Sequence, residues 1–162
     1  STSSFFKPIS SEKKGKSGIR PFCSLVDEIH EHKDNSVIEM LRAGTKGNRE
    51  ALMFEITNSG FDRLSVCYAE HDYTVKVCSG ALENDAWFGY VCALDKEDEP
   101  FEDESCWEKV NPLLGVSIFP DFIREQVTEA KGMPSKSCRA RRIWWGTSAS
   151  IRSPTMNSEM LC

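Results

Sequence analysis

The stretch that most constrains the fold is FDRLSVCYAEHDYTVKVC, residues 61–78, in which large apolar side chains alternate with small or polar ones. Strict alternation of this kind is typical of a strand with one buried face. If residues 69–72 form a four-residue loop, the six large residues pair on one face: Tyr68 with Tyr73, Val66 with Val75, and Leu64 with Val77. A slip of one residue would mix the two faces. The pattern therefore predicts an antiparallel hairpin.

The segments on either side predict further strands. Asn-Ser-Gly at 58–60 favours a three-residue hairpin loop with Gly60 in the left-handed conformation. That loop would place Phe54 opposite Leu64, on the same apolar face as the first hairpin. The run AWFGYVCAL at 86–94 is apolar on both sides, which predicts a strand covered on both faces.

Three segments predict helices. Residues 36–44 begin with a capping box, Ser36 with Glu39, and end in a glycine suited to a left-handed stop. A short helix is expected from residue 24 to residue 29. Residues 120–132 carry apolar side chains at helical spacing, which predicts a buried stripe of Phe122, Ile123 and Val127.

Together these elements predict an α+β fold. We expect a four- or five-stranded antiparallel meander packed against N-terminal and C-terminal helices, with residues 113–119 as the optional fifth strand. A chain of 162 residues has the size of one domain. The expected organisation is a disordered basic tail at 1–20, a single globular domain at 21–146 and a loop-like C-terminal segment at 147–162.

The formal net charge of -5 hides a strong segregation of charge along the chain. Lysine and arginine dominate residues 1–20 and 136–152, whereas aspartate and glutamate dominate residues 95–108. The acidic segment predicts a solvated loop. It could also serve as a docking strip for a basic partner, or pair internally with the basic segment at 136–152.

The seven cysteines give no metal or disulfide pattern. Their number is odd, no C-x-x-C unit is present, and no N-x-[ST] glycosylation sequon occurs. We therefore expect reduced thiols in a cytosolic or nuclear protein, with a disulfide-bearing secreted protein as the alternative. A zinc site built across strands from Cys67, Cys78 and Cys92 remains open, but no metal or other cofactor is predicted.

Residues able to perform catalysis are scarce. On a helix, His30 and His32 would point to opposite sides, so both are expected at the surface. The segment AGTKGN at 43–48 lacks the spacing of a phosphate-binding loop. We therefore predict that the protein is not an enzyme, and keep a small cysteine- or metal-dependent enzyme as a minor alternative.

The segment SCRARRIWWG at 137–146 is the strongest candidate for a binding surface. Arginine and tryptophan are favoured at protein interfaces, and the same pair can neutralise phosphates and stack on bases. If the segment is a helix, Trp144 packs inward with its apolar neighbours. The expected contact residues are then those on the outward side: Arg139, Arg141, Arg142 and Trp145.

A second candidate contact lies in the N-terminal tail. Phe5 and Phe6, followed by Lys7 and Pro8, resemble the end of a sliding-clamp-binding peptide, in which two aromatic rings fill a hydrophobic pocket. The glutamine that such peptides carry has no counterpart within this chain. The resemblance implies a protein partner for Phe5 and Phe6.

These observations predict a non-enzymatic intracellular domain with an interaction or regulatory role. It would bind a partner protein or peptide through an exposed sheet edge or through the Arg/Trp surface. The alternative is a nucleic-acid-binding module that uses the basic tail and residues 139–145. No apolar run approaches the roughly 18 residues needed to span a membrane, so no membrane partner is expected.

Overall fold

The computed structural model of the chain describes residues 3–10, 18–58, 64–133 and 147–152. In these residues the strands are β1 (Cys23–Val26), β2 (Leu52–Asn58), β3 (Trp87–Val91) and β4 (Thr147–Arg152). The α-helices are α1 (Ser36–Gly44), α2 (Val66–Cys78), α3 (Trp107–Val110) and α4 (Pro120–Gly132). Short 3-10 turns are η1 (Ile29–Glu31), η2 (Thr45–Gly47) and η3 (Glu104–Cys106).

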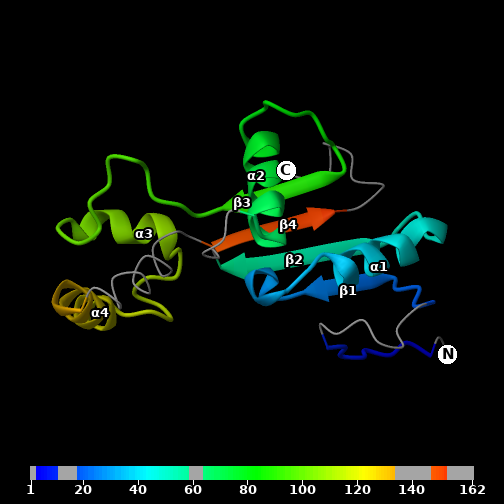
Figure 1. Cartoon of the computed structure of the whole chain (residues 1–162), viewed down its shortest axis with the longest axis horizontal. Coiled ribbons are helices and arrows are strands. Elements are labelled where there is room, and N and C mark those ends of the chain that lie inside the picture. Colours follow the sequence, from blue (N-terminus) through cyan, green and yellow to red (C-terminus); the bar gives the residue numbers. More distant parts are fainter. Residues whose placement is uncertain (1–2, 11–17, 59–63, 134–146, 153–162) are drawn as a thin grey trace.

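The four strands form one mixed sheet in the order β1-β2-β4-β3 (Figure 1). β1 and β2 are parallel, and β4 runs antiparallel to both β2 and β3. A parallel pair needs a crossover connection, which α1 supplies between β1 and β2. The predicted antiparallel meander is therefore wrong, because one pair is parallel and the last strand inserts between two earlier ones.

Helices α1 and α2 cover one face of this sheet (Figure 1). Alternate residues of β2 point to that face and are buried, namely Met53, Glu55 and Thr57. Met53 packs in the main hydrophobic cluster with residues of β1, η1, α1 and α2: Val26, Ile29, Val37, Ile38, Leu41 and Cys67. The opposite face is less covered, since Leu25 of β1 is 61% exposed and Tyr90 of β3 is 52% exposed.

The segment predicted as a hairpin at 61–78 is instead the helix α2. Ser65 caps its first turn, because the side-chain oxygen accepts a hydrogen bond from the Tyr68 backbone N–H at 3.2 Å. Cys67 and Thr74, two turns apart, are its buried residues. Tyr68 stays 40% exposed. The hairpin prediction is wrong, and so is the predicted pairing of Phe54 in β2 with Leu64. Residues 59 and 60 of the predicted turn lie outside the described residues.

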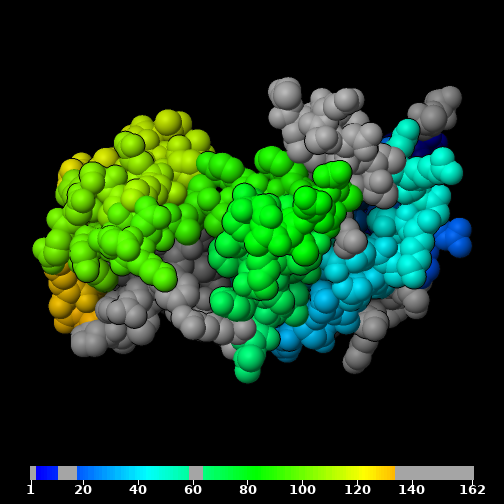
Figure 2. Space-filling model, turned by 90° about the horizontal axis from the view of Figure 1, so that it is seen from above, coloured from blue at the N-terminus to red at the C-terminus, as the bar shows by residue number. Residues whose placement is uncertain are grey.

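Residues 94–133 build a second unit around α3 and α4, which lies at one end of the molecule while α1 lies toward the other (Figures 1 and 2). Its core contains Cys106, Trp107, Ile123 and Val127. The Trp107 indole donates a hydrogen bond to the Pro100 carbonyl at 2.8 Å. Residues 113–119 form turns with one isolated bridge, Leu114 to Ile118, so they are not a fifth strand.

Several local predictions are confirmed and others corrected. The helices at 36–44 and 120–132 are α1 and α4, and β3 lies inside the predicted 86–94 strand. That strand is not covered on both faces as predicted, because Tyr90 is 52% exposed. Phe122 is 54% exposed, so it does not belong to the buried stripe of α4. The helix expected at 24–29 is wrong, because β1 ends at Val26 and η1 follows. The C-terminal segment expected to be loop-like contributes β4.

Candidate functional site

The carboxyl ends of the parallel strands β1 and β2 bring polar residues together. The pairing register sets Val26, the last residue of β1, beside Glu55 of β2. Asp27 and Glu28 follow β1 directly and are both exposed. Thr57 and Asn58 lie at the corresponding end of β2. Ligands of sheets with parallel strands bind outside these carboxyl ends, so this edge is the candidate site.

Glu28 has an unusual backbone conformation at this edge. Its φ of 53° and ψ of 49° lie in the left-handed region, and it is the one non-glycine residue with positive φ in the part of the chain that the structure describes. Such a conformation costs about 1–3 kcal/mol and persists where surrounding contacts enforce it. The Glu28 N–H donates to the Asp27 carboxylate at 2.9 Å. The acidic pair is thus held in one defined turn.

The side chain of His30 lies against this turn and is only 8% exposed. Its Nδ1 is 3.0 Å from Glu28 Oε2 and 3.3 Å from Thr57 Oγ1. The His30 backbone N–H also donates to Thr57 Oγ1 at 3.1 Å, and its Nε2 is 3.3 Å from Glu31 Oε1. The prediction of a surface histidine on a helix is therefore wrong for His30.

Thr57 connects the histidine to helix α2. Its hydroxyl donates to the Asn58 carbonyl at 2.8 Å, and Cys67 Sγ lies 3.4 Å from the same Thr57 oxygen. The Cys67 thiol is also 3.5 Å from the Asn58 carbonyl. The acidic turn after β1, the end of β2 and the first turn of α2 are therefore joined through His30, Thr57 and Cys67.

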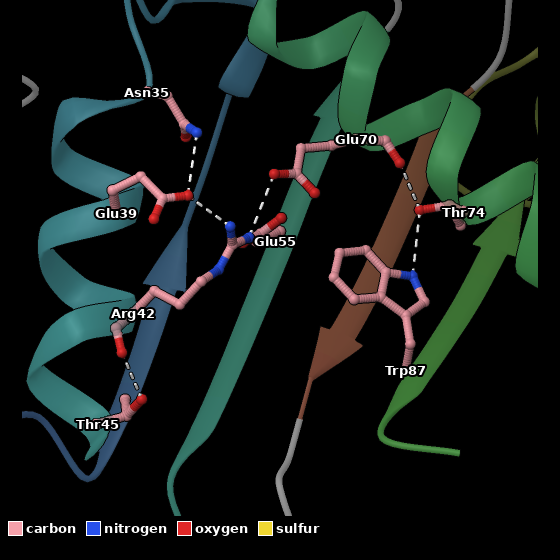
Figure 3. Close-up of polar contacts among 8 residues, drawn as sticks. All are labelled: Asn35, Glu39, Arg42, Thr45, Glu55, Glu70, Thr74 and Trp87. Atoms are coloured by element: carbon pink, nitrogen blue, oxygen red, sulfur yellow. Dashed lines mark hydrogen bonds and ion pairs between the residues drawn. The ribbon is translucent and has the colours of Figure 1, made fainter. Parts of the chain in front are cut away.

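A partly buried charge cluster lies beside this arrangement, where α1 and α2 face β2 (Figure 3). The Arg42 guanidinium contacts Glu39 at 2.7 Å, Glu70 at 3.2 Å and Glu55 at 3.6 Å. Burial alone would lower the pKa of Arg42, but the three carboxylates, Glu70 foremost, raise it above its ordinary value. Glu55 is only 3% exposed. Arg42 therefore links the two helices to the sheet electrostatically.

The chemistry of the acidic turn fits a magnesium ion bound together with a phosphate ligand. Mg²⁺ prefers oxygen ligands and is usually held by one or two carboxylates plus substrate phosphates. Asp27 and Glu28 provide exposed carboxylates at the strand end. Within the described residues, no three His, Cys, Asp or Glu side chains are grouped closely enough to hold a metal by themselves.

None of the binding residues predicted from sequence is seen at this site in the part of the chain that the structure describes. Arg139, Arg141, Arg142 and Trp145 lie outside the described residues, so their role stays a prediction. Phe5 and Phe6 are 86% and 82% exposed. The five cysteines in the described part are free: Cys23, Cys67, Cys78, Cys92 and Cys106.

The acidic segment is partly neutralised within its own unit. Lys109 contacts Asp95 at 2.7 Å and Asp98 at 2.8 Å, and Arg124 of α4 contacts Glu104 at 2.6 Å. These cations come from α3 and α4. Some of the carboxylates at 95–108 therefore stabilise the fold of this unit.

Comparison with known proteins relates both units to one type of protein. A family model described as "Terminase large subunit, ATPase domain" matches residues 1–76, and one described as "Terminase large subunit, endonuclease domain" matches residues 81–143. The chain resembles a terminase large subunit. Protein YmfN of Escherichia coli (strain K12) is 32% identical over 114 residues, which cover 70% of this chain and 25% of that protein.

The chain thus spans about a quarter of the length of protein YmfN. No solved structure matches it significantly. The two terminase matches overturn the prediction of a non-enzymatic interaction or regulatory domain, because they point to an ATPase and nuclease. In the described residues, no helix combines the length and apolar character needed to cross a membrane.

Proposed function

We propose that this chain is part of a terminase-like DNA-packaging enzyme and that the acidic turn after β1 takes part in its ATP hydrolysis. The observation that carries the proposal is the pair Asp27 and Glu28 at the carboxyl end of a parallel strand, inside the segment similar to a terminase ATPase domain. Nucleotide-hydrolysing proteins with a phosphate-binding loop hold Mg²⁺ with an aspartate at such a strand end.

The two carboxylates would have different roles in this reaction. Asp27, directly after β1, would hold Mg²⁺, which neutralises negative charge on the nucleotide phosphates when bound. Glu28 would orient the attacking water and accept its proton. Its fixed left-handed backbone favours this role, because it sets the direction in which the side chain leaves the backbone. The Gly-x₄-Gly-Lys-[Ser/Thr] sequence of a phosphate-binding loop is not found in this chain. We propose that another part of the full-length protein supplies it.

DNA is the proposed nucleic-acid partner. The similarity to terminase domains supports a nucleic acid as a partner of this protein. In the segment similar to a terminase endonuclease domain, several carboxylates are engaged by Lys109, Arg124 and Lys131. A protein partner for Phe5, Phe6 and the Arg/Trp segment stays a prediction.

The test uses the full-length protein that contains this chain. Glu28→Gln should lower kcat for ATP hydrolysis by about 10²–10⁴-fold, the usual contribution of a general base, and leave ATP binding intact. Asp27→Asn should weaken the Mg²⁺ dependence of the reaction. Glu50→Gln is the matched control, because Glu50 is an exposed carboxylate that precedes β2, at the opposite end of that strand. Equal activity of Glu28→Gln and Glu50→Gln would refute the proposal.

A further inference from the structure

We infer that His30 is a positioning residue, which orients the Glu28 carboxylate and couples it to Thr57 at the end of β2. This inference rests on the proposed function, since it assigns the control of Glu28 within the same site. It starts from the two contacts of His30 Nδ1, 3.0 Å to Glu28 Oε2 and 3.3 Å to Thr57 Oγ1.

The available hydrogens decide which atom donates in these contacts. The Thr57 hydroxyl hydrogen is directed to the Asn58 carbonyl at 2.8 Å, so Thr57 Oγ1 can only accept from the ring. An ionised Glu28 carboxylate also only accepts. The hydrogen shared by both contacts must therefore be carried by His30 Nδ1. One ring N–H thus faces the acidic turn and the neighbouring strand together.

The histidine is fixed more firmly than the carboxylate it contacts. The His30 ring is 8% exposed, whereas the Glu28 side chain is 51% exposed. The backbone N–H of His30 is tied to the same Thr57 oxygen at 3.1 Å. An exposed glutamate has considerable rotamer freedom, which a hydrogen bond from a buried, anchored donor restricts. His30 therefore sets where the Glu28 carboxylate lies.

The same contacts extend to helix α2. Cys67 Sγ lies 3.4 Å from Thr57 Oγ1, so a shift of the first turn of α2 would move Thr57 and the His30 ring. The position of Glu28 would then respond to the position of α2. Positional errors of about 1 Å in a reacting group can cost about 10²-fold in rate, so small shifts are enough to matter.

Two histidine variants separate positioning from simple packing. The side-chain amide nitrogen of asparagine can reach the place of Nδ1, whereas that of glutamine reaches the place of Nε2. We expect His30→Gln to lower kcat of the full-length protein by about 10–100-fold with KM for ATP unchanged. His30→Asn should retain most of the activity. His32→Gln is the matched control, because His32 is a half-buried histidine that lies beyond η1.

A second pair of variants tests the other end of the contact. Thr57→Val removes the hydroxyl with little change of shape and should lower kcat as His30→Gln does. Thr57→Ser keeps the hydroxyl and should keep kcat near that of the unmodified protein. If His30→Asn and His30→Gln lose kcat equally, or if neither loses it, the inference is overturned. Absence of ATP hydrolysis in the unmodified protein would instead refute the proposed function itself.

Discussion

Gly89 in β3 lies where α2 packs directly against the sheet. A Cβ atom at this position would lie 2.3 Å from Thr74 Cγ2 and 3.0 Å from Cys78 Sγ, both on α2. Carbon atoms in favourable contact are about 3.5–4.0 Å apart, so Gly89→Ala requires a displacement of more than about 1 Å. Overpacking of this kind costs about 1–3 kcal/mol of unfolding free energy.

Thr74 cannot easily turn its methyl group away. Its hydroxyl donates to the Glu70 carbonyl at 2.7 Å and accepts from the Trp87 indole N–H at 3.3 Å, which fixes the side-chain rotamer (Figure 3). Thr74→Ser removes the clashing methyl group and keeps both hydrogen bonds. The double variant Gly89→Ala with Thr74→Ser should therefore recover most of the stability that Gly89→Ala loses.

Urea unfolding of the 162-residue chain, followed by tryptophan fluorescence, measures this effect because Trp87 and Trp107 are buried. The double-mutant cycle isolates the clash between positions 74 and 89. The reasoning fails if Gly89→Ala stays within about 0.5 kcal/mol of the unmodified chain, the range of ordinary surface substitutions. It fails equally if Thr74→Ser gives no recovery.

Two further changes test the charged groups. Arg42→Met should destabilise the chain by up to about 3–5 kcal/mol, because it removes a cation that compensates Glu55 and Glu70 in a buried setting. Adding Glu55→Gln should return part of this loss in the same urea titration, and an unchanged midpoint for Arg42→Met would contradict the role of the cluster. In the second unit, the hydrogen bond from Lys109 holds the pKa of Asp98 below its ordinary value. The stability from this pair is therefore present above the ordinary aspartate pKa and is lost as the pH falls through the lowered one. Lys109→Met should flatten the acid side of a plot of melting temperature against pH, and an unaltered slope would rule this out.

Helices α1 and α4 could be predicted because their sequences carry local signals. Residues 36–44 and 120–132 combine helical spacing of apolar side chains with a start and a stop, and these signals act within the element itself. The capping box did not form as predicted, since Ser36 lies inside the helix and its backbone N–H binds the Asp34 carboxylate at 2.8 Å. The local sequence signals thus predicted the helix α1 correctly but not the residues that cap it.

Helix α2 was mistaken for a hairpin because its buried face is made of small side chains. Cys67 and Thr74 face the sheet, where Gly89 leaves room for close approach, and such residues give no apolar period. The large residues Tyr68 and Val75 are each 40% exposed, so large apolar side chains do not mark the buried face of this helix. Whether this segment forms a helix or a strand is therefore decided by the sheet surface against which it packs.

The candidate site was missed for a related reason. β1 has only four residues, and its parallel pairing with β2 depends on a crossover connection that the sequence pattern does not predict. A usable signal was nevertheless present: a short strand ending directly in two carboxylates, Asp27 and Glu28, ahead of a helix and a second strand. The link from His30 to Thr57 spans 27 positions and could be seen only in three dimensions.

The placement of β4 between β2 and β3 has a consequence for synthesis of the protein. Before synthesis has reached residue 147, β4 is absent. At that stage β2 has one unpaired edge, and β3 has no neighbouring strand in the described sheet. Unpaired strand edges are templates for wrong pairing with other chains. β3 can pack early only through α2, its neighbour in sequence. The first three strands can therefore share one sheet only after residues 147–152 have left the ribosome.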